Sequence, residues 1–471
     1  MKSSSRRDPD AAPASTSTPA PGSGAYDAPA DWVNLNELAA RGPADSDVPL
    51  APIYTRHSPE QARSWAQDQQ QRRRRRSSGG GDSEREPGEG GSPVREVPPR
   101  DAIREPVSRL TTETYTVSYL ILFAIFGTLA RVGLAALTSY TGNPVVFSSV
   151  WPNFAGCVIM GFLTEDRMLF RDEWGTPTYD QLIALAKLEH DGSSRSTQPQ
   201  SRAVDLVAAK NAHLATKKTI PLYIGLTTGF CGSFTSFSAF IRDVFLAVSN
   251  SMVFPGYDIP VERNGGDSFM ALVAVILTTT SLSIAGFFIG SHIAMAVERF
   301  TPSIPFPVTR KFLDPLSVVL GWGCWLGAVL MAVLPPANRW RGEILFSLVF
   351  GPLGCLLRFY LSVHLNGKIP AFPLGTFTAN VFGTAVLGMA FDIAHVPIGG
   401  RTGCQVLQGI EDGFCGCLTT ISTAVLELVT LKRQHAYIYG LTGVVVATAI
   451  MIAIMGGLRW TEGFHGLECQ S

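Results

Sequence analysis

Charged residues are scarce in this chain. Asp, Glu, Lys and Arg make up 16% of its 471 residues, against 46% hydrophobic residues, a balance that argues against a set of ordinary soluble domains. The formal net charge is zero, but it averages a polar N-terminal part with apolar segments that carry few charges. The charge balance therefore gives no indication of nucleic-acid binding.

Other chemical signatures are also missing. We find no CxxC pair or His-rich cluster typical of a metal site, and no nucleophile–base set typical of an enzyme. The first hundred residues contain no apolar segment followed by a small-residue cleavage site, so we expect no cleavable signal peptide. The eight cysteines lie almost all within apolar runs, which predicts small hydrophobic side chains rather than a disulfide framework.

Residues 1–110 are rich in Ser, Pro, Gly and Arg, and they contain too little apolar surface to offset the loss of chain entropy on folding. We expect a disordered cytoplasmic tail. Within it, Arg72 to Arg76 precede Ser77 and Ser78. This run is interpreted as a solvated linker, with contact to anionic lipids, weakened by phosphorylation, as the alternative.

Nine apolar runs follow, from Tyr115 onward. Each is roughly 18 to 25 residues long, the length that an α-helix needs to cross about 30 Å of hydrocarbon. They predict an all-α membrane protein with nine transmembrane helices. The expected spans are 116–138, 144–164, 219–248, 268–294, 315–334, 344–364, 372–391, 404–430 and 437–458.

The apolar part repeats itself, which predicts two four-helix units joined by one helix. "GTLARVGL" is echoed by "GCLLRFYL", "NFAGCVIMG" by "NVFGTAVLG", and "GFCGSFTSFSAF" by "GFCGCLTTISTA". The Arg-to-Asn spacing is equal in both copies, from Arg131 to Asn153 and from Arg358 to Asn380. The predicted units are 115–294, with a cytoplasmic loop at 165–218, the linker helix 315–334, and 344–460.

An odd number of connecting helices inverts the second copy, as in many transport proteins. Basic residues in short loops favour a cytoplasmic N-terminus and an extracellular C-terminus, and we expect a multi-pass plasma-membrane protein. The residues that support this orientation are Arg104, Arg109, Lys217, Lys218, Arg310, Lys311, Lys432 and Arg433, whereas Arg339, Arg341 and Arg401 oppose it.

The segment "GLTTGFCGSFTSFSAF" (residues 225–240) combines glycines, hydroxyls and phenylalanines. Such a membrane helix is expected to break, and the break must be buried in protein or line a cavity. Two inverted breaks would bring main-chain carbonyls together as an oxygen cage for a monovalent cation, from Gly232, Thr235, Gly416 and Thr419. The alternative is a pair of small-residue helix-packing faces.

Phe237 and Phe240 follow the first break at a spacing of three, so they project from one helix face. The positive edges of two such rings can line a dry path for a small anion. Ser238 and Thr235 add hydroxyl donors, and Asn153 adds an amide within another apolar helix. Packing of the phenylalanines in the core or against lipid remains the alternative.

Arg131 and Arg358 each lie within an apolar run, where a charged side chain is seldom accidental. They are interpreted as anion-attracting charges at a pore vestibule, with snorkelling to the membrane interface as the alternative. The pair Arg242–Asp243 and Glu427 lie late in their helices and are interpreted as interfacial.

These residues resemble the fluoride channels and exporters often called Fluc or FEX, in their fused two-domain eukaryotic form. The resemblance covers roughly residues 115–460 and includes the "GFCGSFTSFSAF" signature. It implies a central structural Na⁺ and fluoride pores lined by Asn and Phe, and since bacterial subunits pair antiparallel, we expect the fused chain to act as a monomer. By resemblance, the Na⁺ site comprises Gly232, Thr235, Gly416 and Thr419, and the pore residues are Asn153, Asn380, Phe237, Phe240 and Ser238.

The second copy departs from this pattern. Ile421 and Ala424 replace the two phenylalanines, although Thr420 and Ser422 remain as candidate pore hydroxyls. One of the two pores is therefore expected to be vestigial, and the sequence does not decide which Asn serves the other. The fourth helices also differ, because "LTTTSLS" offers a hydroxyl track where the second copy keeps Thr448.

The function implied is passive fluoride export through a channel in the lipid bilayer, giving fluoride resistance. A small, strongly hydrated anion crosses only where donors replace its water, which suits sparse amides, hydroxyls and ring edges. A proton-coupled transporter is the alternative, with Asp392 and Glu427 as the candidate intramembrane acids. A membrane receptor or scaffold that works through the Arg-rich tail is the third class.

Overall fold

The computed structural model describes residues 108–170, 217, 219–253, 263–334, 344–396 and 400–467. These residues all belong to one compact unit and form helices, without a strand among them. The expected tail, with its arginine run, and most of the expected loop at 165–218 lie outside the described residues. The description below therefore concerns the helical part alone.

The first series of helices contains one long helix that is interrupted. Helices α2 (Arg109–Thr138) and α3 (Val150–Glu165) precede it, and α9 (Gly265–Val297) follows it. The interrupted helix consists of α6 (Pro221–Ile224), the π-helical segment η4 (Gly225–Cys231), α7 (Gly232–Phe234) and α8 (Phe237–Val248).

A second series of helices follows in the same order after a connecting helix. The connection comprises α10 (Phe306–Val308), η5 (Thr309–Leu313) and α11 (Asp314–Val333). Helices α12 (Phe346–Leu365), α13 (Leu374–Ala394) and α17 (Arg433–Thr461) are its uninterrupted members. Its interrupted helix consists of α14 (Gly400–Gly409), η7 (Ile410–Cys415), α15 (Gly416–Leu418) and α16 (Ser422–Thr430).

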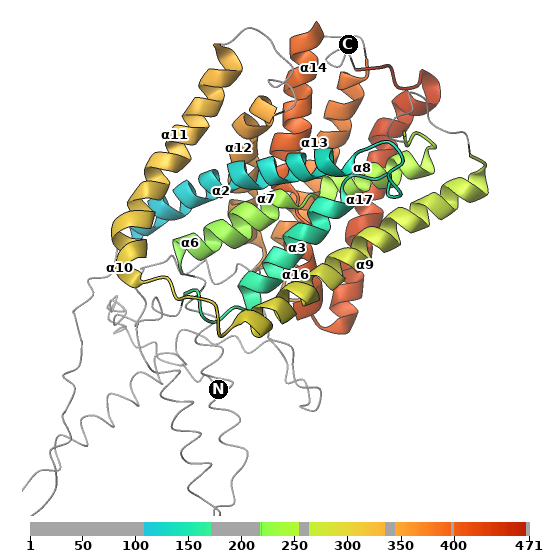
Figure 1. Ribbon diagram of the computed structural model, residues 1–471. Coiled ribbons are helices and arrows are strands. Elements are labelled where there is room, and N and C mark those ends of the chain that lie inside the picture. Colours follow the sequence, from blue (N-terminus) through green and yellow to red (C-terminus); the bar gives the residue numbers. More distant parts are fainter. Residues whose placement is uncertain are drawn as a thin grey trace, which may run out of the picture. The chain divides into compact units, whose positions relative to one another are not determined.

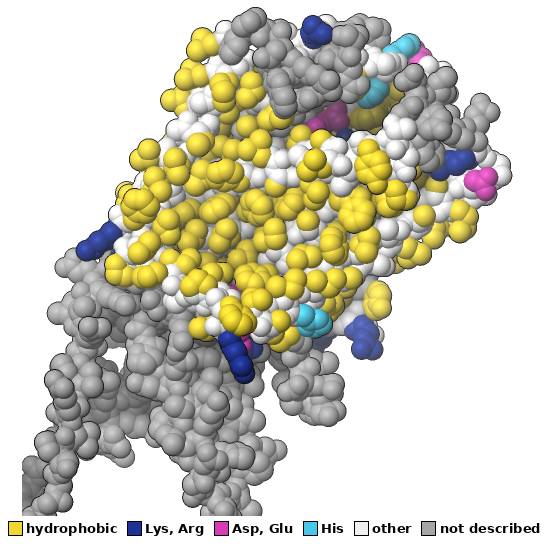
Figure 2. Space-filling view, viewed as in Figure 1, with side chains coloured by type: hydrophobic (Ala, Val, Ile, Leu, Met, Phe, Trp, Pro, Cys, Tyr) yellow, Lys and Arg dark blue, Asp and Glu magenta, His cyan; other side chains and the backbone are white. Residues whose placement is uncertain are grey.

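Eight of the described helices are long and apolar enough to cross a membrane. The segment expected at 144–164 forms α3, which has 16 residues, shorter than the others. On the face that Figure 2 shows, hydrophobic side chains cover the middle, with most of the charged side chains and histidines near the margins. This distribution is the one that a bilayer requires of a protein embedded in it.

The two interrupted helices lie inside the assembly of the other helices. The most apolar stretch of each is 83% and 78% buried within the protein, against 22–56% for the other six candidate spans. Around them, α3 runs alongside α9 (Figure 1). The two helices approach each other closely at Gly161 and Gly290, where an added Cβ would overlap a main-chain carbonyl of the facing helix. Breaks in a membrane helix are tolerated only in such buried positions.

One expectation about the cysteines is wrong. Six of them are free, as expected, and five of these six are buried. Cys404, in α14, is disulfide-bonded. Its position near the beginning of a predicted span, rather than within the apolar centre, explains why the hydrophobic-residue interpretation fails for this side chain.

Candidate functional site

Each interrupted helix changes direction at a threonine. Thr235 has φ −92° and ψ 151°, and Thr419 has φ −93° and ψ 151°, so both are extended between two helical segments. The two breaks therefore have the same local geometry, although one follows "CGSF" and the other "CGCL". Both threonines are fully buried.

An asparagine from a neighbouring helix binds the main chain after each break. Asn153 Oδ1 accepts from the Ser236 N–H at 2.8 Å, and its Nδ2 donates to the Ser236 carbonyl at 3.3 Å. Asn380 makes the same pair of bonds with Thr420, at 2.8 Å and 3.2 Å. These amides are predicted pore residues, and the structure places both of them against the broken main chain.

At the two breaks, side-chain oxygens accept hydrogen bonds from four main-chain N–H groups. In a continuous helix, these N–H groups would donate to four main-chain carbonyls. In an α-helix, the Ser236 N–H would bond the Gly232 carbonyl, and the Ala239 N–H would bond that of Thr235. The first donates instead to Asn153, and the second to Ser236 Oγ at 3.2 Å. In the second copy, the Thr420 N–H donates to Asn380 Oδ1 and the Thr423 N–H donates to Thr420 Oγ1. In a continuous helix, these two N–H groups would donate to the carbonyls of Gly416 and Thr419.

The threonine hydroxyl at each break caps a helix of the other copy. Thr235 Oγ1 accepts from the N–H groups of Ile421 and Ser422 at 3.2 Å and 3.1 Å, at the beginning of α16. Thr419 Oγ1 accepts from the Ser238 N–H at 3.0 Å, at the beginning of α8. Capping by a side chain satisfies helix N–H groups that have no partner within the helix. Here the caps are exchanged between the two copies.

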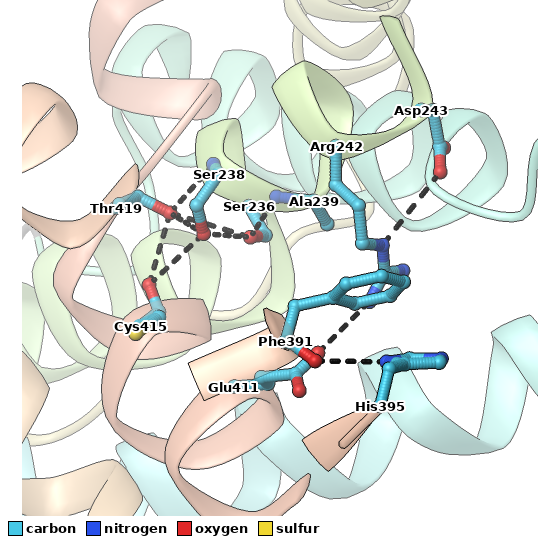
Figure 3. Close-up of polar contacts among 10 residues, drawn as sticks. All are labelled: Ser236, Ser238, Ala239, Arg242, Asp243, Phe391, His395, Glu411, Cys415 and Thr419. Atoms are coloured by element: carbon cyan, nitrogen blue, oxygen red, sulfur yellow. Dashed lines mark hydrogen bonds and ion pairs between the residues drawn. The ribbon is translucent and has the colours of Figure 1, made fainter. Parts of the chain in front are cut away.

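A cluster of buried hydroxyls surrounds these caps. Figure 3 shows the Thr419 hydroxyl close to those of Ser236 and Ser238, at 3.3 Å and 3.0 Å. On the other side, Thr235 Oγ1 lies 3.1 Å from both Thr420 Oγ1 and Ser422 Oγ. The structure therefore brings together the predicted pore hydroxyls and the threonines of the predicted cation site.

Arg131 and Arg358 direct their guanidinium groups to main-chain carbonyls at the breaks. Arg131 donates to the carbonyl of Ser233 at 2.9 Å and to that of Asp412 in the other copy. Arg358 donates to the carbonyl of Cys417 at 3.0 Å and to that of Thr228 in the other copy at 2.7 Å.

These arginines are buried rather than directed to the membrane surface. Arg131 is 7% exposed and Arg358 is 0% exposed. Each also occupies the space beside a glycine of the other copy, because a Cβ on Gly232 would lie 2.3 Å from Arg358 and one on Gly416 would lie 2.3 Å from Arg131. The snorkelling alternative for the two arginines is therefore not what the structure shows.

The two predicted pore phenylalanines lie together in α8. Their rings are 5.8 Å apart between centroids and nearly perpendicular, and Phe237 and Phe240 are both buried. Helix α8 packs against α9 of its own copy and against α13 and α17 of the other. Ile421, the second-copy counterpart of Phe237, is also buried, but nothing aromatic faces it from Ala424.

A cavity of about 200 Å³ lies where the two copies meet. Asn153, Ser236 and Arg131 line it from the first copy, and Glu411, Asp412 and Gly416 line it from the second. Arg242 also faces it. The cavity thus combines an amide, a hydroxyl and two guanidinium groups with two carboxylates, a set that can replace the hydration shell of a small ion.

Several further acidic residues near the two interrupted helices are buried. Glu427 is 1% exposed and accepts from the hydroxyls of Thr376 and Tyr439, both at 2.7 Å. Asp243 is 5% exposed. Both side chains are enclosed by protein. Glu411 and Asp412 did not enter the sequence interpretation, although two adjacent acids directly before "GFCG" were a visible signal.

This fold and this site define a polytopic helical membrane protein with a polar, ion-accommodating interior between two similar halves. Residues 118–291 and 345–458 match the family described as "CrcB-like protein, Camphor Resistance (CrcB)". The chain belongs to this family. The two matched regions correspond to the two series of helices, and the unmatched interval contains the connecting helix α11.

Curated relatives cover most of the chain. It is 56% identical to "Fluoride export protein 1" of Neurospora crassa over 385 residues, which are 79% of this chain and 71% of the relative. It is 34% identical to the protein of that name from Candida albicans, over 72% of this chain and 79% of the relative. "Fluoride-specific ion channel FluC 1" of Staphylococcus epidermidis is 37% identical over 108 residues, 22% of this chain and 86% of the relative. No solved structure matches the chain.

Proposed function

We propose that this protein is a channel through which fluoride leaves the cytoplasm by passive electrodiffusion, and that it thereby gives the cell fluoride resistance. The observation that carries the proposal is the cavity at the junction of the two copies, lined by Asn153, Ser236 and two arginines. Fluoride is small and strongly hydrated, so donors of this kind must replace its water. The printed names of the relatives, fluoride export protein and fluoride-specific ion channel, support the same ion.

One conducting pore is proposed, with the other vestigial. Phe237 and Phe240 would line the conducting pore, together with the hydroxyls of Ser238, Thr420 and Ser422. Their support is the paired aromatic edges in α8, which have no counterpart in α16. Of the two asparagines, Asn153 lines the cavity, and this favours it as the amide that an entering ion meets. Asn380 is proposed to serve the second path.

A structural Na⁺ is proposed between the breaks, held by the main-chain carbonyls of Gly232, Thr235, Gly416 and Thr419. The support for this site is that four main-chain N–H groups donate to side chains and not to these carbonyls, as they would in a continuous helix. The carbonyl oxygens could then bind a cation. Uncharged oxygen ligands suit a hard monovalent cation. Such an ion would stabilise the crossing point of the two interrupted helices.

We further propose nine spans in two inverted units, 115–294 and 344–460, joined by 315–334. The cytoplasmic N-terminus, extracellular C-terminus, plasma-membrane location and monomeric state are parts of this proposal. The disulfide at Cys404 supports the orientation, because this residue would then lie on the outer side, where disulfides persist. A monomer follows from fusion of the halves, since one chain supplies both.

Fluoride efflux from liposomes containing the purified full-length chain, followed with a fluoride electrode, tests the proposal. Efflux under an electrical potential, unchanged when the proton gradient alone is collapsed, is expected of a channel. Loss of efflux with that collapse would favour a coupled transporter. Deletion of residues 1–100 should leave efflux intact, and its loss would favour a function that depends on the tail.

The cation site is tested separately by melting the detergent-solubilised protein. A ligand that binds the folded state raises its stability by mass action. The melting temperature should therefore rise with Na⁺ concentration more than with K⁺ at matched ionic strength. Equal melting curves in the two salts, with efflux intact, would leave small-residue packing as the better account of the glycine-rich segments.

A further inference from the structure

The cavity beside Asn153 contains two arginines that are held in different ways. Arg131 donates to two main-chain carbonyls, so its hydrogen-bonding capacity is directed to the breaks. Arg242 instead faces carboxylates: its Nη1 lies 3.6 Å from Glu411 Oε2, and its Nε lies 4.0 Å from Asp243 Oδ1. Figure 3 shows its guanidinium group between these two acids. Of the two arginines, Arg242 is therefore the one whose carboxylate partner an entering anion could replace.

Glu411 holds this arginine from the opposite copy. Its residue is 8% exposed, and it belongs to η7, whereas Arg242 belongs to α8. When it is ionised, a buried carboxylate repels an anion in the same cavity, and the repulsion is stronger than in water because the surroundings are less polarisable. A site that only attracted anions would not contain it. Its contact with Arg242 at 3.6 Å is longer than a charge-assisted hydrogen bond of 2.7–2.9 Å.

We infer that Arg242 and Glu411 together determine anion selectivity and affinity in this cavity: Arg242 binds the entering anion, and the Glu411 carboxylate competes with that anion for the same guanidinium group. The inference rests on the proposed fluoride channel and names two of its residues. An anion must displace the carboxylate to reach Arg242, so weakly hydrogen-bonding anions are disfavoured. Once the anion leaves, the carboxylate returns, which prevents the arginine from trapping it.

The first test is fluoride efflux from liposomes as a function of fluoride concentration, for the wild-type chain and Glu411→Gln. Loss of a competing charge at this distance should lower the half-saturating fluoride concentration about tenfold. It should also lower the maximal efflux, because the anion is released more slowly, and it should make chloride a stronger inhibitor. Arg242→Gln should raise the half-saturating concentration, and Arg242→Lys, which retains the charge, should restore most of the affinity.

Asp412→Asn is the matched control. Asp412 lines the same cavity, but its side chain makes none of the ion pairs with Arg242 found among the described residues. Its replacement should change the half-saturating concentration less than Glu411→Gln does. An equal effect of the two substitutions would mean that overall cavity charge, and not competition for Arg242, controls the anion.

A second measurement does not require conduction. The melting temperature of the solubilised chain should rise at lower fluoride concentrations in Glu411→Gln than in the wild type. Unchanged fluoride dependence in both measurements, for a folded Glu411→Gln or, if that variant does not fold, for Glu411→Ala, which also removes the carboxylate, would overturn the inference. Absence of efflux from the wild type would instead overturn the proposed function, and the melting experiment would still decide the role of this pair.

Discussion

The Thr235 hydroxyl lies 3.1 Å from the main-chain nitrogen of Ser422, and so a side chain of the first copy caps a helix of the second. Thr419 returns the contact by accepting from the Ser238 N–H. Each half of the protein thus completes the hydrogen bonding of the other at the centre of the assembly. Neither α8 nor α16 has all of these partners within its own half.

Removal of one of these hydroxyls should destabilise the protein. Thr235→Val leaves the N–H groups of Ile421 and Ser422 without this buried acceptor, and a buried unsatisfied group costs about 1–3 kcal/mol. Thr235→Ser retains the oxygen and should be tolerated, losing only the methyl contact with Gly156. Melting temperatures of the solubilised variants check this. Loss of stability in Thr235→Ser with none in Thr235→Val would show that the methyl group, not the hydroxyl, matters.

Gly232 and Gly416, which lie beside the guanidinium groups of Arg358 and Arg131, should tolerate no side chain. Gly232→Ala places a methyl group against the Arg358 guanidinium, and Gly416→Ala does the same at Arg131, so both should lower folding yield and efflux. Gly323→Ala, in α11, is the control, because a Cβ there has no neighbour within 4 Å. Size-exclusion chromatography and efflux measure the outcome. Wild-type behaviour of the first two variants would contradict the observed close approach.

Equivalent substitutions in the two copies should have unequal effects. Phe237→Ile and Phe240→Ala copy second-half residues into the first half and should abolish fluoride resistance in a cell lacking its own exporter. Ile421→Phe should change little. Phe359→Leu, a buried aromatic in α12, controls for general loss of packing. Growth in fluoride, with protein levels measured in parallel, gives the comparison, and similar loss from both copies would mean that both pores conduct.

Lys217 should make stability depend on pH at one end of α3. Its ammonium group donates to the carbonyls of Leu163 and Asp166 and lies 5.3 Å from the centre of the Tyr223 ring. Burial lowers the pKa of Lys217 to about 8, from an ordinary value of 10.5. Between these values the unfolded chain binds more protons than the folded one, so stability attributable to Lys217 rises with pH across this window.

The comparison is with Lys217→Met, which keeps the apolar stem and removes the titrating group. The difference in melting temperature between the wild type and this variant should shift in favour of the wild type from about pH 8 to pH 10. A constant difference over this range would indicate that Lys217 keeps its ordinary pKa in the folded protein.

The sequence was informative where a local pattern dictates geometry. The glycine- and hydroxyl-rich segments predicted two broken helices, and the equal Arg-to-Asn spacings placed Arg131, Asn153 and their counterparts near them. The sequence could not predict which side chains of one helix contact the main chain of a distant helix. The exchange of caps at Thr235 and Thr419 depends on how two distant segments cross. No spacing within either segment encodes it.

The same limit applies to the cavity. Arg242 and Glu411 lie in different copies, far apart in the sequence, and no motif links them. Arg131 and Arg358 were correctly singled out as unusual, but their carbonyl partners became visible only with the packing. Long charged side chains can reach many neighbours, so sequence position constrains them weakly.

The contacts that Arg131 makes with main-chain carbonyls of both copies have a consequence for synthesis of the chain. When the first half emerges from the ribosome, Asp412 has not been synthesised, and Arg131 lacks one of its two carbonyl acceptors. A chain that stops before this residue exposes a cation in a hydrophobic environment, at a penalty of about 2.5–3.5 kcal/mol. Only a chain translated through both halves conceals that charge.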